Sequence, residues 1–465
     1  MQSDVREDVP LMKPAEHISF AHLFKAIPME EVKASLCATN RNDQRERDLP
    51  ARFIVFFVIA LSLYSDCSSA EVFRQLVETL KNMFGPAVKF KVPAKSSLTY
   101  ARTKLGVEPF RDLFRKVARP LECQGSSLGA FFKNYRLVSL DGSHFNVPDT
   151  VENEARFGRA KTGTGPAAFP LIRSVAKIEI GTRAILDFEH GAGGGSKEES
   201  ENKLARELLT RLKKDELCIA DRLYANYPLW MIAQATGAAL LWRAKADFKF
   251  EPIKELPDGS YLARLQHNVN GKAKDHVPVR IIEYSIGENN YRLITNLPHD
   301  TASAKELADL YHERWEHEIA IQEQKQGLNA YLTTLRSKTP DLVEQELIGL
   351  YLMHYLVRSL MHEAAKSVDI DVDRLSFKHA IKVIRRRSPQ VGAFSPEHVY
   401  NCMVQEILEV QNKRQVGRSN PRSVKSLQRK YSVLSKRERP RGRFSFQNSH
   451  IPTFPALRSP RAVYA

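Results

Sequence analysis

Cysteine and long apolar runs are both scarce in this chain of 465 residues. The five cysteines are scattered, odd in number and without CxxC spacing, which excludes a disulfide framework and a zinc knuckle, so we expect reduced thiols in the core. The longest apolar run, residues 53–64, is about half as long as a membrane-spanning helix, and no cleavable leader precedes it. These absences predict a soluble, cytoplasmic protein without a membrane partner.

Motifs of two common enzyme classes are missing as well. The glycine-rich segment 191–195 precedes Lys197 without the GxxxxGK[ST] spacing of a phosphate-binding loop. His312 and His317 are five residues apart, which turns them about 140° from each other on a helix, whereas the zinc motif HExxH needs a spacing of four. The sequence therefore supports neither nucleotide hydrolysis nor a zinc protease.

Acidic residues are nearly absent from the carboxyl-terminal segment 411–465. This segment holds fourteen Lys or Arg residues against the single acidic residue Glu438, and so carries +13 of the formal net charge of +16. Five prolines interrupt it. Such a composition is typical of a flexible basic tail that binds phosphates without reading bases, although it also fits a tail that only adds solubility. The charge predicts a polyanionic partner.

Four residues of one segment have a spacing that suits work on phosphates. Tyr311, Arg314, Glu318 and Lys325 follow one another at gaps of three, four and seven, and at about 100° per residue they fall within about 60° on a helix. A carboxylate, two cations and a phenol on one face suit a metal ligand flanked by phosphate-holding groups. A helix whose charges only solvate it has the same composition.

The neighbouring acidic residues of this segment fall on other faces. Glu313, Glu316 and Glu323 are turned about 120° to 200° from Tyr311 by the same arithmetic. We interpret all three as solvent-exposed, and expect their replacement by Gln to cost little. The helical face therefore selects Glu318 among the carboxylates of the segment.

The tetrad Tyr-x2-Arg-x3-Glu-x6-Lys resembles the signature of the insertion-sequence-4 family of bacterial DDE transposases. Two further segments match the same family, Leu137-Val-Ser-Leu-Asp141-Gly-Ser and Leu217-Cys-Ile-Ala-Asp221-Arg. The resemblance also covers 47–85, 148–158 and 335–346, and is weakest at the far carboxyl end. It implies a DNA transposase of an insertion sequence, which binds terminal inverted repeats and cleaves and joins strands through a hairpin intermediate.

The resemblance further implies that Asp141, Asp221 and Glu318 are the catalytic residues and metal ligands. Converging carboxylates repel one another unless divalent cations neutralise them, and oxygen ligands favour Mg²⁺, for which Mn²⁺ can substitute. Two such ions per site suit an in-line phosphoryl displacement. Each aspartate taken alone has another explanation: Asp141, in an Asp-Gly pair, is typical of a turn, and Asp221, at a strand end, is typical of a cap.

DNA contacts are implied in the same way. Arg314 and Lys325 would contact phosphate and Tyr311 the DNA backbone, whereas ion pairing to Glu318 is the structural alternative for the cations. Arg222, directly after the second aspartate, is included among the DNA-binding residues.

Tyr291 lies where related enzymes place an aromatic residue that stacks on a flipped base. Some relatives have tryptophan there, and a tyrosine buried in a strand is the alternative. The expected partners are double-stranded DNA, both the inverted repeats and the target, and a second copy of the chain in a synaptic homodimer, in a nucleoid-associated protein.

Hydrophobic periodicity predicts five parts. Residues 1–130 are helical, with a helix-turn-helix at 97–118 whose cations could enter a DNA groove: Arg102, Lys104, Arg111, Arg115 and Lys116. Residues 131–245 begin the catalytic core, 246–297 form a β-strand insertion, 298–410 complete the core with helices, and 411–465 form the tail.

Within 131–245, the β-rich runs are 137–140, 145–147, 171–180 and 182–188, followed by a helix from Ser196 to about residue 214 and a buried strand that ends at Asp221. The fold class is α/β, a ribonuclease-H-like mixed sheet flanked by helices. In that fold the first and fourth strands are neighbours, which would bring Asp141 beside Asp221.

Two other functions remain open at this stage. A DNA-binding protein derived from a transposase would regulate DNA without cutting it, but has no physical need for three aligned carboxylates. A stand-alone ribonuclease-H-like nuclease would need neither the basic tail nor the amino-terminal helices. Terminal inverted repeats in the DNA that flanks the coding region would favour the transposase over these two functions.

Overall fold

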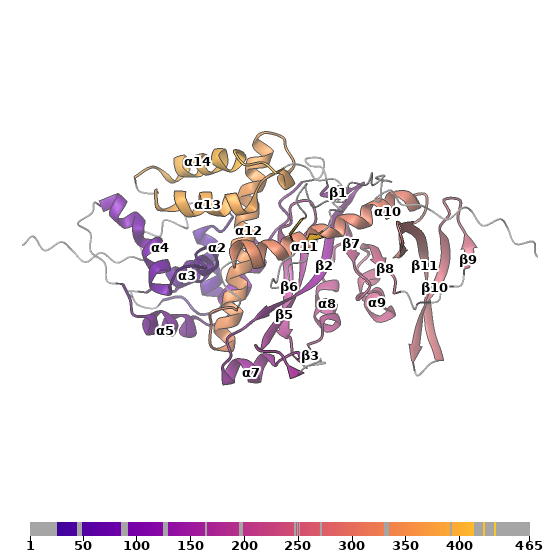
Figure 1. Ribbon diagram of the computed structural model, residues 1–465, viewed down its shortest axis with the longest axis horizontal. Helices are drawn as coiled ribbons and strands as arrows, with labels where there is room; N and C mark the ends of the chain where they lie inside the picture. Colours follow the sequence, from indigo (N-terminus) through magenta and orange to yellow (C-terminus); the bar gives the residue numbers. More distant parts are fainter. Residues whose placement is uncertain are drawn as a thin grey trace, which may run out of the picture. The chain divides into compact units, whose positions relative to one another are not determined.

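The computed structural model (Figure 1) describes most of the chain between residues 26 and 433. The described ranges are 26–43, 49–84, 92–123, 129–162, 165–194, 199–245, 248, 250, 252–269, 272–329, 334–390, 393–412, 422–423 and 432–433. The chain forms two compact units, Met1–Trp242 with Glu313–Asn412, and Arg243–His312 with Lys413–Ala465. The predicted basic tail lies outside the described residues, except for 411–412 and the short strands β13 (Arg422–Ser423) and β14 (Ser432–Val433).

Helices make up the amino-terminal part of the first unit: α2 (Met29–Ala38), α3 (Ala51–Leu63), α4 (Ser69–Phe84), α5 (Lys95–Leu105) and α6 (Glu108–Val117). Helix α3 is apolar on every side and is buried from Phe53 to Leu63, because it packs against the long helix α12 (Pro340–Ser367). The two backbones approach closely at Gly349, where a Cβ would lie 2.9 Å from the carbonyl oxygen of Val58. The helical region and its break at Gly106 are as predicted.

The carboxyl-terminal helices of the first unit also follow the prediction. They are α12, η4 (Val372–Arg374), α13 (Phe377–Arg387), η5 (Ser388–Gln390) and α14 (Pro396–Leu408). Ser376 and Ser395 cap α13 and α14, since each hydroxyl accepts a hydrogen bond from a backbone N–H of the first turn. Helices α13 and α14 pack against each other and against α12.

The central sheet of the first unit has the strand order β6-β5-β2-β7-β8 (Figure 1), and the short strand β1 (Phe131–Phe132) also pairs with β2. Its strands are β2 (Tyr135–Asn146), β5 (Leu171–Glu179), β6 (Ile185–Ala192), β7 (Glu216–Ala220) and β8 (Ala239–Arg243). β2 pairs antiparallel with β5 and parallel with β7, and β7 pairs parallel with β8. This is the ribonuclease-H-like order, so the predicted pairing of the first and fourth strands is confirmed.

Two boundaries within this region were predicted wrongly. The runs 137–140 and 145–147 form one continuous strand, so Asp141 lies inside β2 rather than in a turn. The cause is the pairing with β5, which continues through Asp141 and Gly142 to Asn146 and overrides the turn preference of Asp-Gly. Helix α8 (Glu201–Leu209) begins later than the expected start at Ser196, and residues 195–198 lie outside the described residues.

Smaller elements complete the described core of this unit: β1 (Phe131–Phe132), α7 (Val151–Phe157), β3 (Lys161–Thr162), β4 (Gly165–Pro166) and α9 (Tyr227–Ala235). Asn226 caps α9 by accepting a hydrogen bond from the backbone N–H of Leu229 at 3.1 Å. Helix α9 and strand β8 are as predicted.

The second unit contains the predicted β-strand insertion. Strands β9 (Pro252–Glu255), β10 (Tyr261–Val269), β11 (Lys272–Ile286) and β12 (Asn289–Thr295) form an antiparallel sheet in the order β12-β11-β10-β9. Helix α10 (Ala304–Tyr311) follows, and Ser303 with Glu306 forms a capping box at its start.

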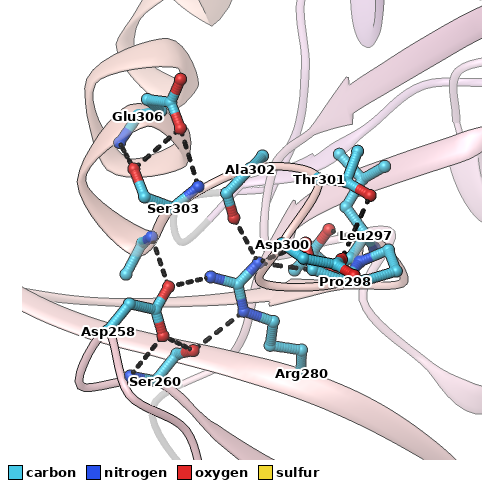
Figure 2. Close-up of polar contacts among 12 residues, drawn as sticks. Asp258, Ser260, Arg280, Leu297, Pro298, Asp300, Thr301, Ala302, Ser303 and Glu306 are labelled. Atoms are coloured by element: carbon cyan, nitrogen blue, oxygen red, sulfur yellow. Dashed lines mark hydrogen bonds and ion pairs between the residues drawn. The ribbon is translucent and has the colours of Figure 1, made fainter.

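Arg280 of β11 connects the sheet of the second unit to the start of α10 (Figure 2). Its side chain is 2% exposed and pairs with Asp258, which in turn accepts a hydrogen bond from the backbone N–H of Ala304 at 2.8 Å. The guanidinium also donates to the hydroxyl of Ser260 and to the carbonyl oxygens of Leu297, Pro298 and Ala302. This buried arginine therefore holds the loop before α10 in place.

Within the described ranges, no helix combines the length and apolar character that a bilayer span requires. The cysteines are free thiols, but the expectation that they lie in the core is wrong for the two exposed ones. Cys218 is buried, whereas Cys37 and Cys123 are exposed and Cys67 and Cys402 are partly exposed.

Candidate active site

The tetrad segment is helical but not one uniform α-helix. Helix α10 is followed by the 3-10 turn η2 (His312–Arg314), by α11 (Trp315–Gln322) and by the π-helix η3 (Glu323–Leu328). A change in residues per turn shifts every later side chain around the axis. The helical-wheel angles agree with the contact between Arg314 and Glu318, whereas Lys325 lies within the π-helix, where the angle per residue differs.

Parallel pairing of β2 with β7 brings the two aspartates together. Leu140 and Ala220 are register partners, so Asp141 and Asp221 follow at adjacent positions of neighbouring strands. Burial raises the pKa of Asp141 although the Arg314 guanidinium opposes the rise, and burial together with nearby Asp141 raises the pKa of Asp221. Two carboxylates this close favour a cation between or beside them.

Arg314 links the third carboxylate to the first. Its Nη1 donates to Asp141 Oδ2 at 3.1 Å, and its Nη2 donates to Glu318 Oε1 at 2.8 Å. The guanidinium is 18% exposed, and Glu318 is 39% exposed. Arg314 of η2 therefore joins Asp141 of β2 to Glu318 of α11, and Asp221 at the end of β7 lies beside Asp141.

His317 fixes α11 against the sheet, and sequence reasoning gave it no role beyond rejecting zinc. Its Nδ1 lies 2.7 Å from Ser139 Oγ on β2, and the ring is fully buried. Burial, with the nearby Arg314 charge, lowers the pKa of His317 to about 3, so the imidazole is neutral at physiological pH. This contact joins α11 to β2 at the residue before Glu318.

Lys325 lies beside the strand that carries Asp141. Its Nζ is 5.3 Å from the ring centroid of Phe145, and its side chain is half-buried, which lowers its pKa. A cavity of about 250 Å³ opens here, lined by His144, Phe145, Asn146, Lys325, Asn329, Thr334 and Leu335. Lys325 therefore lines a recess beside the end of β2.

Glu316 and Glu323 are not solvent-exposed, which corrects the expectation for both. Arg183 pairs with each of them, and Glu323 also accepts hydrogen bonds from Arg358 Nε at 2.9 Å and contacts His354 Nε2 at 3.1 Å. Both glutamates lie on the side of the segment that Arg183 covers, and Glu323 also faces Arg358 and His354 of α12. Glu313 is exposed, as expected.

Two of the expected DNA contacts lie in the second unit. Tyr311 ends α10 and is buried, with its ring 5.8 Å from that of His312. Tyr291 is partly exposed, stacks on its cross-strand partner Tyr284 at 5.1 Å, and has the Arg243 guanidinium over its ring at 4.5 Å. Arg222 belongs to the first unit, is exposed, and directly follows Asp221.

The basic helix-turn-helix needs a correction. Arg102 is buried and donates to Gln345, Ser337 and the carbonyl of Leu342. Arg111 pairs with Glu344 at 2.8 Å. Buried Arg102 is therefore not available to a DNA groove, whereas Arg111 joins α6 to α12 and stays 36% exposed. Charge alone cannot distinguish a cation that faces solvent from one that neutralises a buried partner.

A fourth carboxylate near the site, Glu201, was missed. Tyr224 Oη donates to Glu201 Oε1 at 2.8 Å, and the Glu201 carboxylate lies against Gly142. Burial, together with Asp141 and Asp221, raises the pKa of Glu201. Its place at the start of α8 gave no signal in the spacing of motifs, and only the tertiary fold brings it here.

The donor set fits a hard divalent cation by its chemistry. Asp141, Asp221 and Glu318 supply carboxylate oxygens alone, and the Arg314 guanidinium already bridges two of them as a cation does. Among the described side chains, no three His, Cys, Asp or Glu residues stand ready to hold one ion together. Cation binding there therefore competes with Arg314.

Comparison with known proteins identifies the family. Residues 17–115 match the model described as insertion element 4 transposase N-terminal, and residues 133–356 match the transposase DDE domain. The chain is similar to transposase InsG for insertion sequence element IS4 of Escherichia coli (strain K12), at 27% identity over 407 residues, covering 84% of this chain and 89% of the relative. It is also similar to putative transposase InsZ of that organism, at 26% identity over 236 residues, covering 50% and 73%.

A solved structure, the cryo-EM structure of the piggyBac transposase synaptic complex with hairpin DNA, aligns with a TM-score of 0.41 and 13% identity over 86% of this chain and 82% of that chain. A likeness of this degree supports no inference. The two matched models occur in order and together span most of the chain, and they coincide with the helical amino-terminal part and the carboxylate-bearing core. The chain therefore belongs to the insertion-sequence-4 family of DDE transposases, enzymes of insertion sequences that cleave and join DNA strands.

Proposed function

We propose that Asp141, Asp221 and Glu318 are the catalytic triad of this transposase and hold two Mg²⁺ ions, for which Mn²⁺ can substitute. The observation that carries the proposal is the strand register that places Asp141 beside Asp221, together with the hydrogen bonds of Arg314 to both Asp141 and Glu318. Divalent cations bound there would activate a water and stabilise the leaving oxygen of a phosphodiester. The three carboxylates orient and neutralise those cations.

The neighbouring cations would hold the DNA. Arg314, once released from the carboxylates, can bind a phosphate through two parallel N–H donors. Lys325, facing the recess beside β2, would contact a second phosphate, and exposed Arg222 a third. Tyr311 would contact the DNA backbone. Tyr291 would stack on a flipped base during hairpin formation, a role for which Arg243 must leave its ring.

The wider proposal is a protein that acts at the nucleoid as a homodimer on two transposon ends and on target DNA. In it, residues 1–130 bind the inverted repeats, 131–245 and 298–410 form the catalytic core around the insertion 246–297, and the tail 411–465 adds phosphate contacts. The match of residues 17–115 to a transposase amino-terminal model supports the first assignment.

Cleavage of the element's own ends tests the proposal. Purified protein is incubated with a duplex that carries the terminal inverted repeat, with Mg²⁺, Mn²⁺ or a chelator. We expect metal-dependent nicks that expose a 3′-hydroxyl at the element end, followed by hairpin products on a denaturing gel. Specific binding without any cleavage under either metal would overturn the assignment of the site.

Replacing Arg314 by Ala should tighten cation binding while it weakens cleavage. Loss of the guanidinium removes a positive charge that competes for Asp141 and Glu318, so Mn²⁺ affinity should rise several-fold. Cleavage at saturating metal should fall by about 10-fold or more, because the bidentate phosphate contact is lost. Electron paramagnetic resonance titration of free Mn²⁺ and a cleavage assay measure the two effects.

Arg222→Ala is the matched control, since it removes an exposed neighbouring charge that does not bridge the carboxylates. It should change Mn²⁺ affinity much less. Equal effects of the two substitutions would show that only net charge matters and that the Arg314 bridge is unimportant.

A further inference from the structure

Glu201 contacts the segments that carry both catalytic aspartates. It is the first residue of α8, and its carboxylate lies against Gly142, the residue after Asp141. A Cβ built on Gly142 would lie 2.4 Å from Glu201 Cδ and within 2.6 Å of both its oxygens. The absence of a side chain at Gly142 therefore makes room for this carboxylate.

Tyr224 connects Glu201 to the second aspartate. Its ring is fully buried, its hydroxyl donates to Glu201 Oε1 at 2.8 Å, and its backbone N–H donates to the carbonyl of Asp221 at 3.3 Å. Leu223 N also donates to Asp221 Oδ1 at 2.7 Å. Asp221 therefore accepts both backbone hydrogen bonds that stabilise the turn after β7. The position of Tyr224 thus sets the position of this turn.

The geometry points to Glu201 as a positioning residue that sets the separation of Asp141 and Asp221 through its contact with Gly142 and its hydrogen bond to Tyr224. The inference rests on the proposed role of the two aspartates as metal ligands. Parallel strands β2 and β7 fix the two backbones only up to Leu140 and Ala220, their last paired residues. Past these residues, Glu201 joins the strand that carries Asp141 to the turn after Asp221, through its contact with Gly142 and its hydrogen bond with Tyr224. A misplacement of a ligand by a fraction of an ångström weakens metal binding.

Three substitutions separate positioning from charge. Tyr224→Phe removes only the hydroxyl, Glu201→Ala removes the carboxylate, and Glu201→Gln keeps an oxygen that accepts the Tyr224 hydrogen bond. We expect Tyr224→Phe and Glu201→Ala to raise the Mn²⁺ concentration at half-saturation by about 3- to 10-fold, and to raise the Mg²⁺ requirement of cleavage in parallel. Glu201→Gln should stay close to the wild type. A loss in Glu201→Gln as large as that in Glu201→Ala would overturn the positioning role and show that the charge acts directly.

Gly142→Ala tests the same contact from the other side. The new methyl group collides with the end of a flexible side chain, so it should displace Glu201 rather than unfold the strand. Gly142→Ala alone should weaken Mn²⁺ binding, whereas in the Glu201→Ala background it should add nothing. Full additivity of the two changes would contradict the inference.

Controls keep the outcomes distinct. Glu207→Gln changes an exposed glutamate on the same helix and should leave Mn²⁺ binding unchanged. Thermal unfolding verifies that each variant is folded. Asp141→Asn and Asp221→Asn serve as references: if they leave Mn²⁺ binding intact, the proposed site fails, and if they abolish it while Tyr224→Phe does not weaken it, only the role of Glu201 fails.

Discussion

Replacement of Asp141, Asp221 or Glu318 by its amide is expected to reduce Mg²⁺-dependent cleavage by at least about 100-fold, because removal of even a group that supports a metal ligand costs about 10- to 100-fold. The amides keep the size and hydrogen bonding of the acids but lose the charge that binds the cation. Asp141 is 19% exposed, Glu318 is 39% exposed, and Asp221 is partly exposed directly after β7. The fold should therefore tolerate the changes.

End binding should survive these substitutions, because helical residues outside the triad carry it in the proposed function. A gel-shift assay and a cleavage assay on the same inverted-repeat duplex separate the two effects. The matched control is Glu313→Gln, an exposed acidic residue five positions before Glu318. Near-normal cleavage by any one of the three triad variants would remove that residue from the site.

Glu323→Gln is expected to destabilise the protein by about 3 kcal/mol, contrary to the expectation from the helical wheel. The glutamate is 9% exposed and pairs with Arg358, which is fully buried, as well as with Arg183. Loss of the carboxylate charge leaves the Arg358 guanidinium buried without its paired carboxylate, whereas Arg183 keeps Glu316 and Asp373 as partners. Chemical denaturation measures the effect, and Glu313→Gln on the same segment should change stability by less than about 0.5 kcal/mol.

The pH dependence of this effect has a defined sign. Burial by itself raises the pKa of Glu323, but the Arg358 guanidinium, together with His354 and Arg183, holds the pKa at about 2, below its ordinary 4.5. A depressed folded-state pKa contributes stability that is complete above the unfolded value and is lost as the pH falls toward the folded value. The difference between wild type and Glu323→Gln should therefore shrink between pH 4.5 and 2. A difference that stays constant over this range would show that the carboxylate charge is not the cause.

Most helices and strands could be predicted from the sequence. Short-range patterns were sufficient for the buried helix α3, the break at Gly106, the strand ending at Asp221 and the antiparallel insertion, since each depends on local periodicity or on a glycine conformation. The run at 137–147 was misjudged because strand pairing with β5 outweighs the local turn preference of Asp-Gly.

Charged side chains show the limit of sequence reasoning most clearly. Arg102 and Arg111 looked like DNA-binding cations and Glu323 like a surface carboxylate, yet all three have buried partners on α12. Whether a charge meets water or an opposite charge depends on residues more than 30 positions away in the chain. A helical wheel contains no such information, and it also assumes a constant number of residues per turn, which the π-helix η3 violates.

By itself, the sequence determined the family motifs and led to the prediction of Asp141, Asp221 and Glu318 as the carboxylates of the site, because motifs depend on residue type and on spacing. Only the tertiary structure decided that Arg314 bridges Asp141 and Glu318, that Lys325 lines a recess with Phe145, and that Glu201 contacts Tyr224 and Gly142. These contacts arise from strand pairing and close packing between distant segments. Their energies depend on distance and burial, neither of which is a property of the linear chain.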